Sequence, residues 1–75
     1  MNEKLFKTIL KRYEAAIEDA AYKIDIICEQ TLVIPEHIDI TGEIDKLLQI
    51  IAENEDKVAA MRKYYGKKKA ESAVL

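Results

Sequence analysis

The sequence predicts an all-α protein in which two long helices form an antiparallel helical hairpin, joined by an ordered aliphatic linker and associating into a helical bundle. Apolar residues recur at alternating spacings of four and three in two separate stretches, which is the heptad pattern of helices that pack side by side. The composition is rich in Ala, Leu, Ile, Lys and Glu, and these residues favour helix. The single proline falls between the two stretches, where it would interrupt a continuous helix.

The first stretch predicts a helix over residues 3–30. Its apolar seam consists of Phe6, Leu10, Tyr13, Ile17, Ala20, Ile24 and Ile27. Asn2 is suited to cap this helix, because its side-chain oxygen can accept a hydrogen bond from a backbone N–H of the first turn. Cys28 lies beside the seam, and we expect it to be a small apolar core residue.

Residues 31–41 break the heptad pattern and form the predicted linker. Pro35 removes a backbone donor and pushes the residue before it towards an extended conformation. Five large aliphatic residues are unusual in a solvated loop: Leu32, Val33, Ile34, Ile38 and Ile40. We therefore expect the linker to lie on the end of the bundle or on a partner, with His37 as an ordinary polar residue.

The second stretch predicts a helix over residues 42–65. We expect Thr41 to be its N-cap, with Glu43 and Asp45 placed favourably in the first turn. The seam of this helix consists of Ile44, Leu47, Ile51, Asn54, Val58, Met61 and Tyr65, with Leu48 beside it. Gly66 is suited to end the helix, and residues 66–75 are predicted to be a flexible basic tail.

The chain is short enough to form one domain over residues 1–75, and a domain of that size has a core worth only about 3–5 kcal/mol. A disulfide within one copy is excluded because Cys28 is the only cysteine, and a structural zinc site lacks its usual four Cys or His ligands. Helix packing or association must therefore supply the stability. Two seams of matching length predict a dimer of hairpins, which would form a four-helix bundle.

Asn54 is the one polar residue on either seam. A buried Asn at such a position lowers stability but can fix the register or the number of helices in a bundle. The alternative is that the predicted phase is slightly wrong, or that the seam is hydrated at this point.

Charge is unevenly distributed along the chain. Residues 1–12 carry four basic groups and residues 57–69 carry six, whereas residues 13–56 hold twelve acidic groups and two lysines. An antiparallel hairpin would bring both basic segments to one end and the acidic segments to the linker end. The basic first turns of the first helix oppose the helix dipole, so an acidic partner segment or a phosphate backbone could compensate for them.

No motif for catalysis, cofactor binding or metal binding is found, so we expect a non-enzymatic protein without a cofactor or metal. The main hypothesis is a protein–protein interaction module that forms a homo-oligomer or serves as an accessory subunit of a larger assembly, such as a viral particle. The residues expected to carry this interaction are Ile17, Ile24, Ile27, Ile44, Leu47, Leu48, Ile51, Asn54 and Val58.

Two further hypotheses remain open. The basic end could bind nucleic acid, with Tyr64 and Tyr65 stacking on bases and phosphate contacts from Lys63, Lys67, Lys68 and Lys69. The competing interpretation is a solvated surface with Tyr65 in the core. Alternatively, the acidic surface could inhibit a basic site on another protein. No apolar run is long enough for a membrane span, so we expect a soluble chain that is cytoplasmic or part of a macromolecular assembly.

Overall fold

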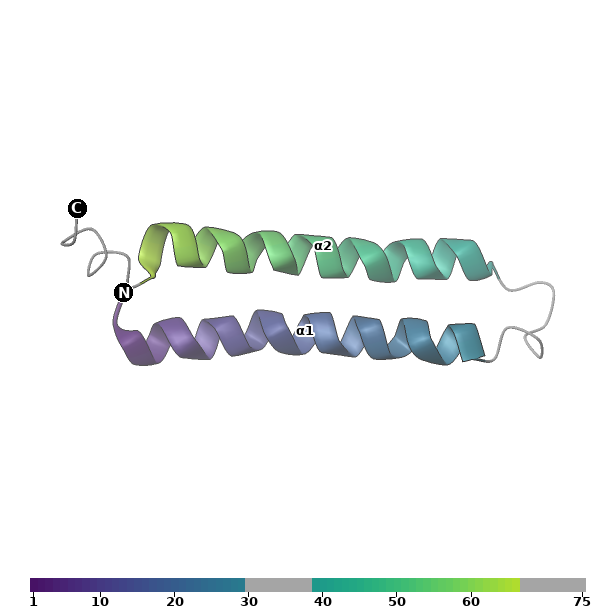
Figure 1. The fold of residues 1–75 in the computed structure, drawn as a ribbon, viewed down its shortest axis with the longest axis horizontal. Helices are drawn as coiled ribbons and strands as arrows, with labels where there is room; N and C mark the ends of the chain where they lie inside the picture. The colour runs from purple at the N-terminus through teal and green to yellow at the C-terminus, as the bar shows by residue number, and fades with distance from the viewer. Residues whose placement is uncertain (30–38, 67–75) are drawn as a thin grey trace.

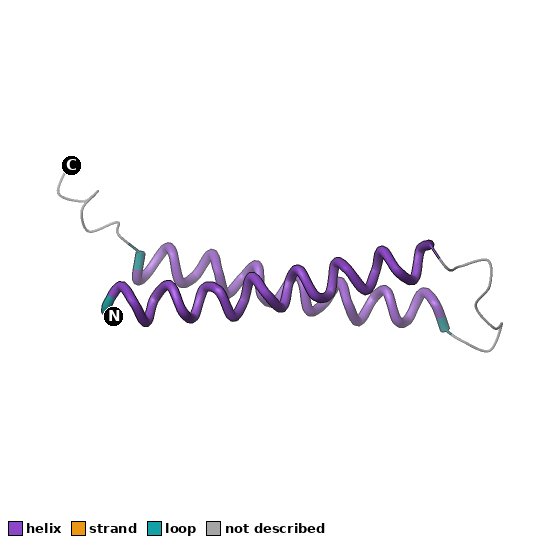
Figure 2. Tube along the Cα trace, turned by 90° about the horizontal axis from the view of Figure 1, so that it is seen from below, coloured by secondary structure: helices purple, strands orange, loops and turns teal. Residues whose placement is uncertain are grey.

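The structure is a computed structural model, and it describes residues 1–29 and 39–66. Helix α1 (Glu3–Glu29) and helix α2 (Ile40–Tyr65) lie side by side and run in opposite directions (Figure 1). Seen from below, the two helices cross at a shallow angle (Figure 2). The start of α1 therefore lies beside the end of α2, and the predicted antiparallel helical hairpin is confirmed.

Helix α1 begins with the predicted cap. The Leu5 backbone N–H donates to Asn2 Oδ1 at 2.8 Å, and the Phe6 N–H donates to the Asn2 carbonyl oxygen at 3.0 Å. The first bond satisfies a donor that has no backbone partner within the helix, and the second is the first bond of the helix itself. The helix extends to Glu29, within one residue of the predicted end.

The predicted start of α2 was wrong, because Asp39 and not Thr41 caps the helix. Asp39 Oδ1 accepts hydrogen bonds from the Gly42 N–H at 3.0 Å and from Thr41 Oγ1 at 3.2 Å. The Glu43 N–H donates to the Asp39 carbonyl oxygen at 3.0 Å. Ile40, expected in the linker, is therefore the first residue of α2. The charge-assisted cap outweighs the poor helix propensity of the Ile-Thr-Gly turn that follows it.

Helix α2 ends at Tyr65, as predicted, and Gly66 follows as the C-cap. The Gly66 N–H donates to the Arg62 carbonyl oxygen at 3.3 Å. Gly66 has a φ of −73° and a ψ of −174°, so the chain leaves the helix in an extended conformation and not through the left-handed turn that a glycine often provides.

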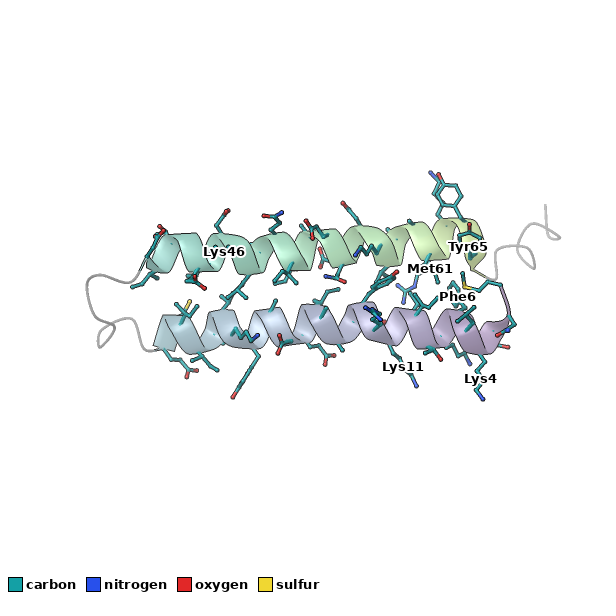
Figure 3. All side chains as sticks on the ribbon, turned by 180° about the vertical axis from the view of Figure 1, so that it is seen from behind. Lys4, Phe6, Lys11, Lys46, Met61 and Tyr65 are labelled. Carbon is teal, nitrogen blue, oxygen red and sulfur yellow. The ribbon has the colours of Figure 1, made fainter. Side chains whose placement is uncertain are left out.

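The core follows the two predicted seams but is thin. Ala20 and Met61 are buried, with 1% and 8% of their surface exposed, and they are the only buried residues in the part of the chain that is described. Figure 3 shows Phe6 and Met61 between the two helices, near the chain termini. The other seam residues are partly buried, apart from Tyr65.

Two expectations about the core were wrong. Tyr65 is 55% exposed, because it occupies the last turn of α2, where the pairing with α1 ends. Cys28 is exposed, because it lies on a flank of the seam in the last turn of α1. A flank residue is covered only when a further element packs beside the pair.

Several predictions concern residues outside those that the structure describes. They include the aliphatic linker, with its Pro35 and His37, and the basic tail from Lys67 onwards. Of the two described helices, neither combines the length and the apolar character that a membrane crossing requires.

Candidate interaction surface

The predicted interaction residues lie where the two helices face each other. Helix α1 contributes Ile17, Ile24 and Ile27, and each is partly buried. Helix α2 contributes further partly buried residues, namely Ile44, Leu47, Ile51, Asn54 and Val58. Leu48 differs, because it is 51% exposed. One neighbouring helix thus covers each seam only in part.

The exposed apolar side chains of the described residues agree with this thin core. They include Leu5, Tyr22, Leu48, Ile50 and Tyr64. Two antiparallel helices form a single layer, so sides of both helices that face away from the seam remain accessible in the described part of the chain. This apolar surface is available for contact with another molecule.

The sequence pattern already places Ile9 and Ala16 beside the seam of the first helix, but sequence reasoning missed that they belong to a larger set of apolar residues. Each of them directly precedes a seam residue, so it lies about 100° around the helix from that residue. Because α1 and α2 are antiparallel, the residues that precede a seam residue fall on the same side of the hairpin in both helices. We call this side the apolar flank, and its residues are Leu5, Ile9, Ala16, Ile26, Ile50 and Tyr64.

Half of the residues of the apolar flank are exposed, whereas every seam residue except Tyr65 is buried or partly buried. Leu5, Ile50 and Tyr64 are 47%, 40% and 62% exposed, while Ile9, Ala16 and Ile26 are partly buried. The signal in the sequence was an apolar residue immediately before each of several seam positions. The signal was hard to recognise because charged residues precede other seam positions, for example Arg12 before Tyr13 and Lys23 before Ile24.

Asn54 lies at its predicted seam position and is partly buried. Its Nδ2 donates to the Ile50 carbonyl oxygen, one turn earlier in α2, at 2.7 Å. This bond gives one amide hydrogen a partner within the same helix. The predicted phase of the seam is therefore correct at Asn54, which places a partly buried polar group among the apolar residues of the seam.

Polar contacts between the helices gather towards the terminal end of the hairpin. Arg62 of α2 lies 3.7 Å from the Glu14 carboxylate of α1, and the Lys57 ammonium lies 5.5 Å from the centre of the Tyr13 ring. Three other ion pairs lie within single helices: Lys7–Glu3, Lys23–Asp19 and Lys46–Glu43. The interhelical contacts set the register in which the two seams meet.

The basic end contains groups from both helices, as the charge pattern predicted. In α1, Lys4 and Lys11 point away from α2 (Figure 3). In α2, Lys63 is exposed, and its ammonium lies 5.4 Å from the centre of the Tyr64 ring. Lys67, Lys68 and Lys69 lie outside the described residues. The basic groups are thus spread around the end of the hairpin and not aligned along one groove.

Across residues 1–29 and 39–66, no three His, Cys, Asp or Glu side chains gather closely enough to hold a metal ion. No protein-family model, curated protein or solved structure matches the chain. Function therefore has to be inferred from the surface of the hairpin itself.

Proposed function

We propose that the chain is a non-enzymatic protein–protein interaction module that self-associates, or docks as an accessory subunit of a larger assembly. The observation that carries this proposal is the incomplete burial of both seams, where only Ala20 and Met61 are buried among the described residues. A core this thin gives little margin against the conformational entropy lost on folding. Association supplies the missing burial of apolar surface.

The proposal is tested by the mass and the stability of the isolated chain over a hundredfold range of concentration. A self-associating chain sediments as an oligomer, and its unfolding free energy rises by about 2.7 kcal/mol per dimer over that range. The thermal midpoint should therefore increase with concentration. A chain that sediments as a monomer and unfolds cooperatively at a constant midpoint contradicts self-association.

A matched pair of variants separates association from helix stability. Ile50→Gln places a polar group on the apolar flank, whereas Ala59→Gln places the same group at an exposed position that directly follows seam residue Val58. We expect Ile50→Gln to weaken the oligomer at unchanged helix content. Ala59→Gln should leave the oligomer intact, and equal losses in the two variants would count against a specific interface.

A second candidate function is nucleic-acid binding by the basic end. The observation in its favour is the meeting of the first turns of α1 with the last turns of α2 at one end of the hairpin (Figure 1). Two of these basic groups already have carboxylate neighbours, since Lys7 lies 3.2 Å from Glu3 and Arg62 lies 3.7 Å from Glu14. This local neutralisation makes the second candidate weaker than the first.

Nucleic-acid binding is tested by fluorescence anisotropy with a labelled single-stranded oligonucleotide at several salt concentrations. Binding through phosphates gives an affinity that falls with salt, with a logarithmic slope of about −0.7 per neutralised phosphate. Replacing Lys63 and Lys67–Lys69 with Gln should reduce that slope, whereas Lys46→Gln at the opposite end should not. Absence of binding at low salt removes this candidate.

A further inference from the structure

We infer that a second copy of the chain docks on the apolar flank in antiparallel orientation, with the basic end of one hairpin over the acidic end of the other. This inference deepens the proposed function and rests on it, since it specifies the face and the direction of self-association. It depends on three features of α1: the arc on which its flank residues lie, their spacing along the helix, and their charge.

The flank of α1 forms a continuous surface along the whole helix. At 3.6 residues per turn, its apolar residues and the three charged residues between them fall within an arc of about 100°, roughly a quarter-turn from the seam. The surface consists of Leu5, Ile9, Arg12, Ala16, Asp19, Lys23 and Ile26. A strip of this width, with apolar residues along its whole length, is the kind of face that a third helix covers in a bundle.

Two pairs of residues on this surface are arranged symmetrically about the point midway between Ala15 and Ala16. Leu5 and Ile26 lie equally far from that point in opposite directions, and so do Arg12 and Asp19. A twofold axis beside Ala16 would place Leu5 against Ile26 of the second copy and Arg12 against Asp19 of the second copy. Apolar groups would then meet apolar groups, and a cation would meet a carboxylate.

The centre of the surface permits close approach of two helices. Ala16 has the smallest side chain of the set and is partly buried, so two copies of α1 can cross beside it at the short end of the usual interhelical range. Lys23 makes an ion pair with Asp19 at 3.0 Å within α1. The aliphatic part of Lys23 can cover Ile9 of the second copy while its ammonium stays in solvent.

The alternative, parallel arrangement of two hairpins is disfavoured by charge. It would lay α1 of one copy over α2 of the other, at the same level along the hairpin. Lys57 lies at the level of Tyr13, as the 5.5 Å ring contact shows, so Arg12 of one copy would face Lys57 of the other. The basic ends would also coincide, whereas the antiparallel arrangement alternates basic and acidic ends.

Disulfide cross-linking tests the position of the twofold axis. In a Cys28→Ser background, Ala16→Cys should form a covalent dimer under mild oxidation, because the two sulfurs lie beside the axis and within bonding reach. Ala21→Cys is the matched control, since Ala21 directly follows seam residue Ala20 and lies about 140° around the helix from Ala16, on the opposite side of the seam. A mixture of single Leu5→Cys and Ile26→Cys chains should also cross-link to each other in preference to themselves.

Charge reversal tests the orientation independently. Arg12→Glu should raise the dissociation constant of the dimer about tenfold, because it faces Asp19 of the second copy. Lys11→Glu makes the same change of charge on the side of α1 that faces away from α2 (Figure 3), and it should change the constant little. Combining Arg12→Glu with Asp19→Lys should recover most of the lost affinity.

The outcomes separate this inference from the proposed function. Cross-linking at position 16 and not at position 21, with recovery in the double reversal, supports the inference. A chain that sediments as a dimer but cross-links equally at positions 16 and 21, or not at all at position 16, overturns the inference and leaves self-association standing. A chain that remains a monomer at high micromolar concentration overturns both the inference and self-association.

Discussion

Arg62 and Glu14 form an ion pair between the two helices, with the guanidinium nitrogen 3.7 Å from the carboxylate oxygen. Both side chains are largely exposed, at 61% and 49%. Solvent screens such a pair, so its value to stability is small, about 0.2–1 kcal/mol. Its role is to favour one register of the hairpin among those that the repeating apolar seams would allow.

A double-mutant cycle should measure this pair directly. We expect Glu14→Gln and Arg62→Gln to show a coupling energy of about 0.5 kcal/mol in urea denaturation, and this energy should fall at high salt. The matched control is the Lys7–Glu3 pair within α1, which cannot affect the register between helices. A coupling energy above 2 kcal/mol would contradict the assignment of a screened surface pair.

The cap of α2 gives a second prediction. Asp39→Ala removes the acceptor of the Gly42 N–H bond, and we expect a loss of about 1 kcal/mol in the free energy of unfolding. Thr41→Ala serves as the control, because the Thr41 hydroxyl only donates to the same carboxylate. Thermal denaturation followed by circular dichroism measures both, and equal losses would restore Thr41 as a candidate cap.

Gly42 gives a related prediction whose sign depends on Asp39. A Cβ added at Gly42 would meet the Asp39 carboxylate, with the Cγ carbon 2.8 Å away. Gly42→Ala should therefore destabilise the helix although alanine has the better helix propensity. In an Asp39→Ala background the same change should stabilise by about 1 kcal/mol. If Gly42→Ala changed the free energy of unfolding by the same amount with Asp39 and with Ala at position 39, a clash with the cap would be ruled out.

Replacing Asn54 removes the polar group from the seam. Asn54→Leu should raise the free energy of unfolding by about 1 kcal/mol or more, because an apolar side chain then contacts the neighbouring seam residues. Gln49→Leu, at an exposed position, is the control and should have little effect. If Asn54 also fixes the register or oligomeric state, the sedimentation profile of Asn54→Leu should broaden into several species.

Ala20 is the most buried residue among those described, with 1% of its surface exposed. Ala20→Leu would force the helices apart, and we expect a loss of about 1–3 kcal/mol. Ala15→Leu, made at an exposed position of the same helix, should be neutral or slightly stabilising. If Ala20→Leu instead raised the free energy of unfolding in denaturation experiments, the helices would not be closely packed at Ala20.

The sequence predicted the fold well because heptad spacing is a strong signal over two dozen residues. Both helices and the phase of both seams follow from that spacing, and their opposite directions follow from the short linker between them. Local choices were harder to predict. Asp39 and Thr41 are both competent caps two residues apart, and hydrogen-bond geometry decides between them. The exposure of Cys28 and Tyr65 depends on where the partner helix ends, which periodicity does not specify.

The candidate surface was predicted only in part for a similar reason. The seam residues follow from periodicity, but a seam alone does not indicate how many helices share it. The exposure of Leu5 and Ile50 depends on the absence of a third helix beside the hairpin in the described residues. The apolar residues that precede the seam fall on one side because the helices are antiparallel, but their degree of exposure comes only from the structure.

The antiparallel course of the hairpin implies an order in which its parts come together. Contacts near the start of α2 join residues close together in the chain, whereas Phe6 and Met61 meet across most of its length. Bringing together residues close in the chain costs less entropy than bringing together distant ones. Pairing should therefore start between the end of α1 and the start of α2 and then extend towards the start of α1 and the end of α2. Amide protons at the start of α1 and the end of α2 should then exchange with solvent fastest. Protection should increase towards the end of α1 and the start of α2.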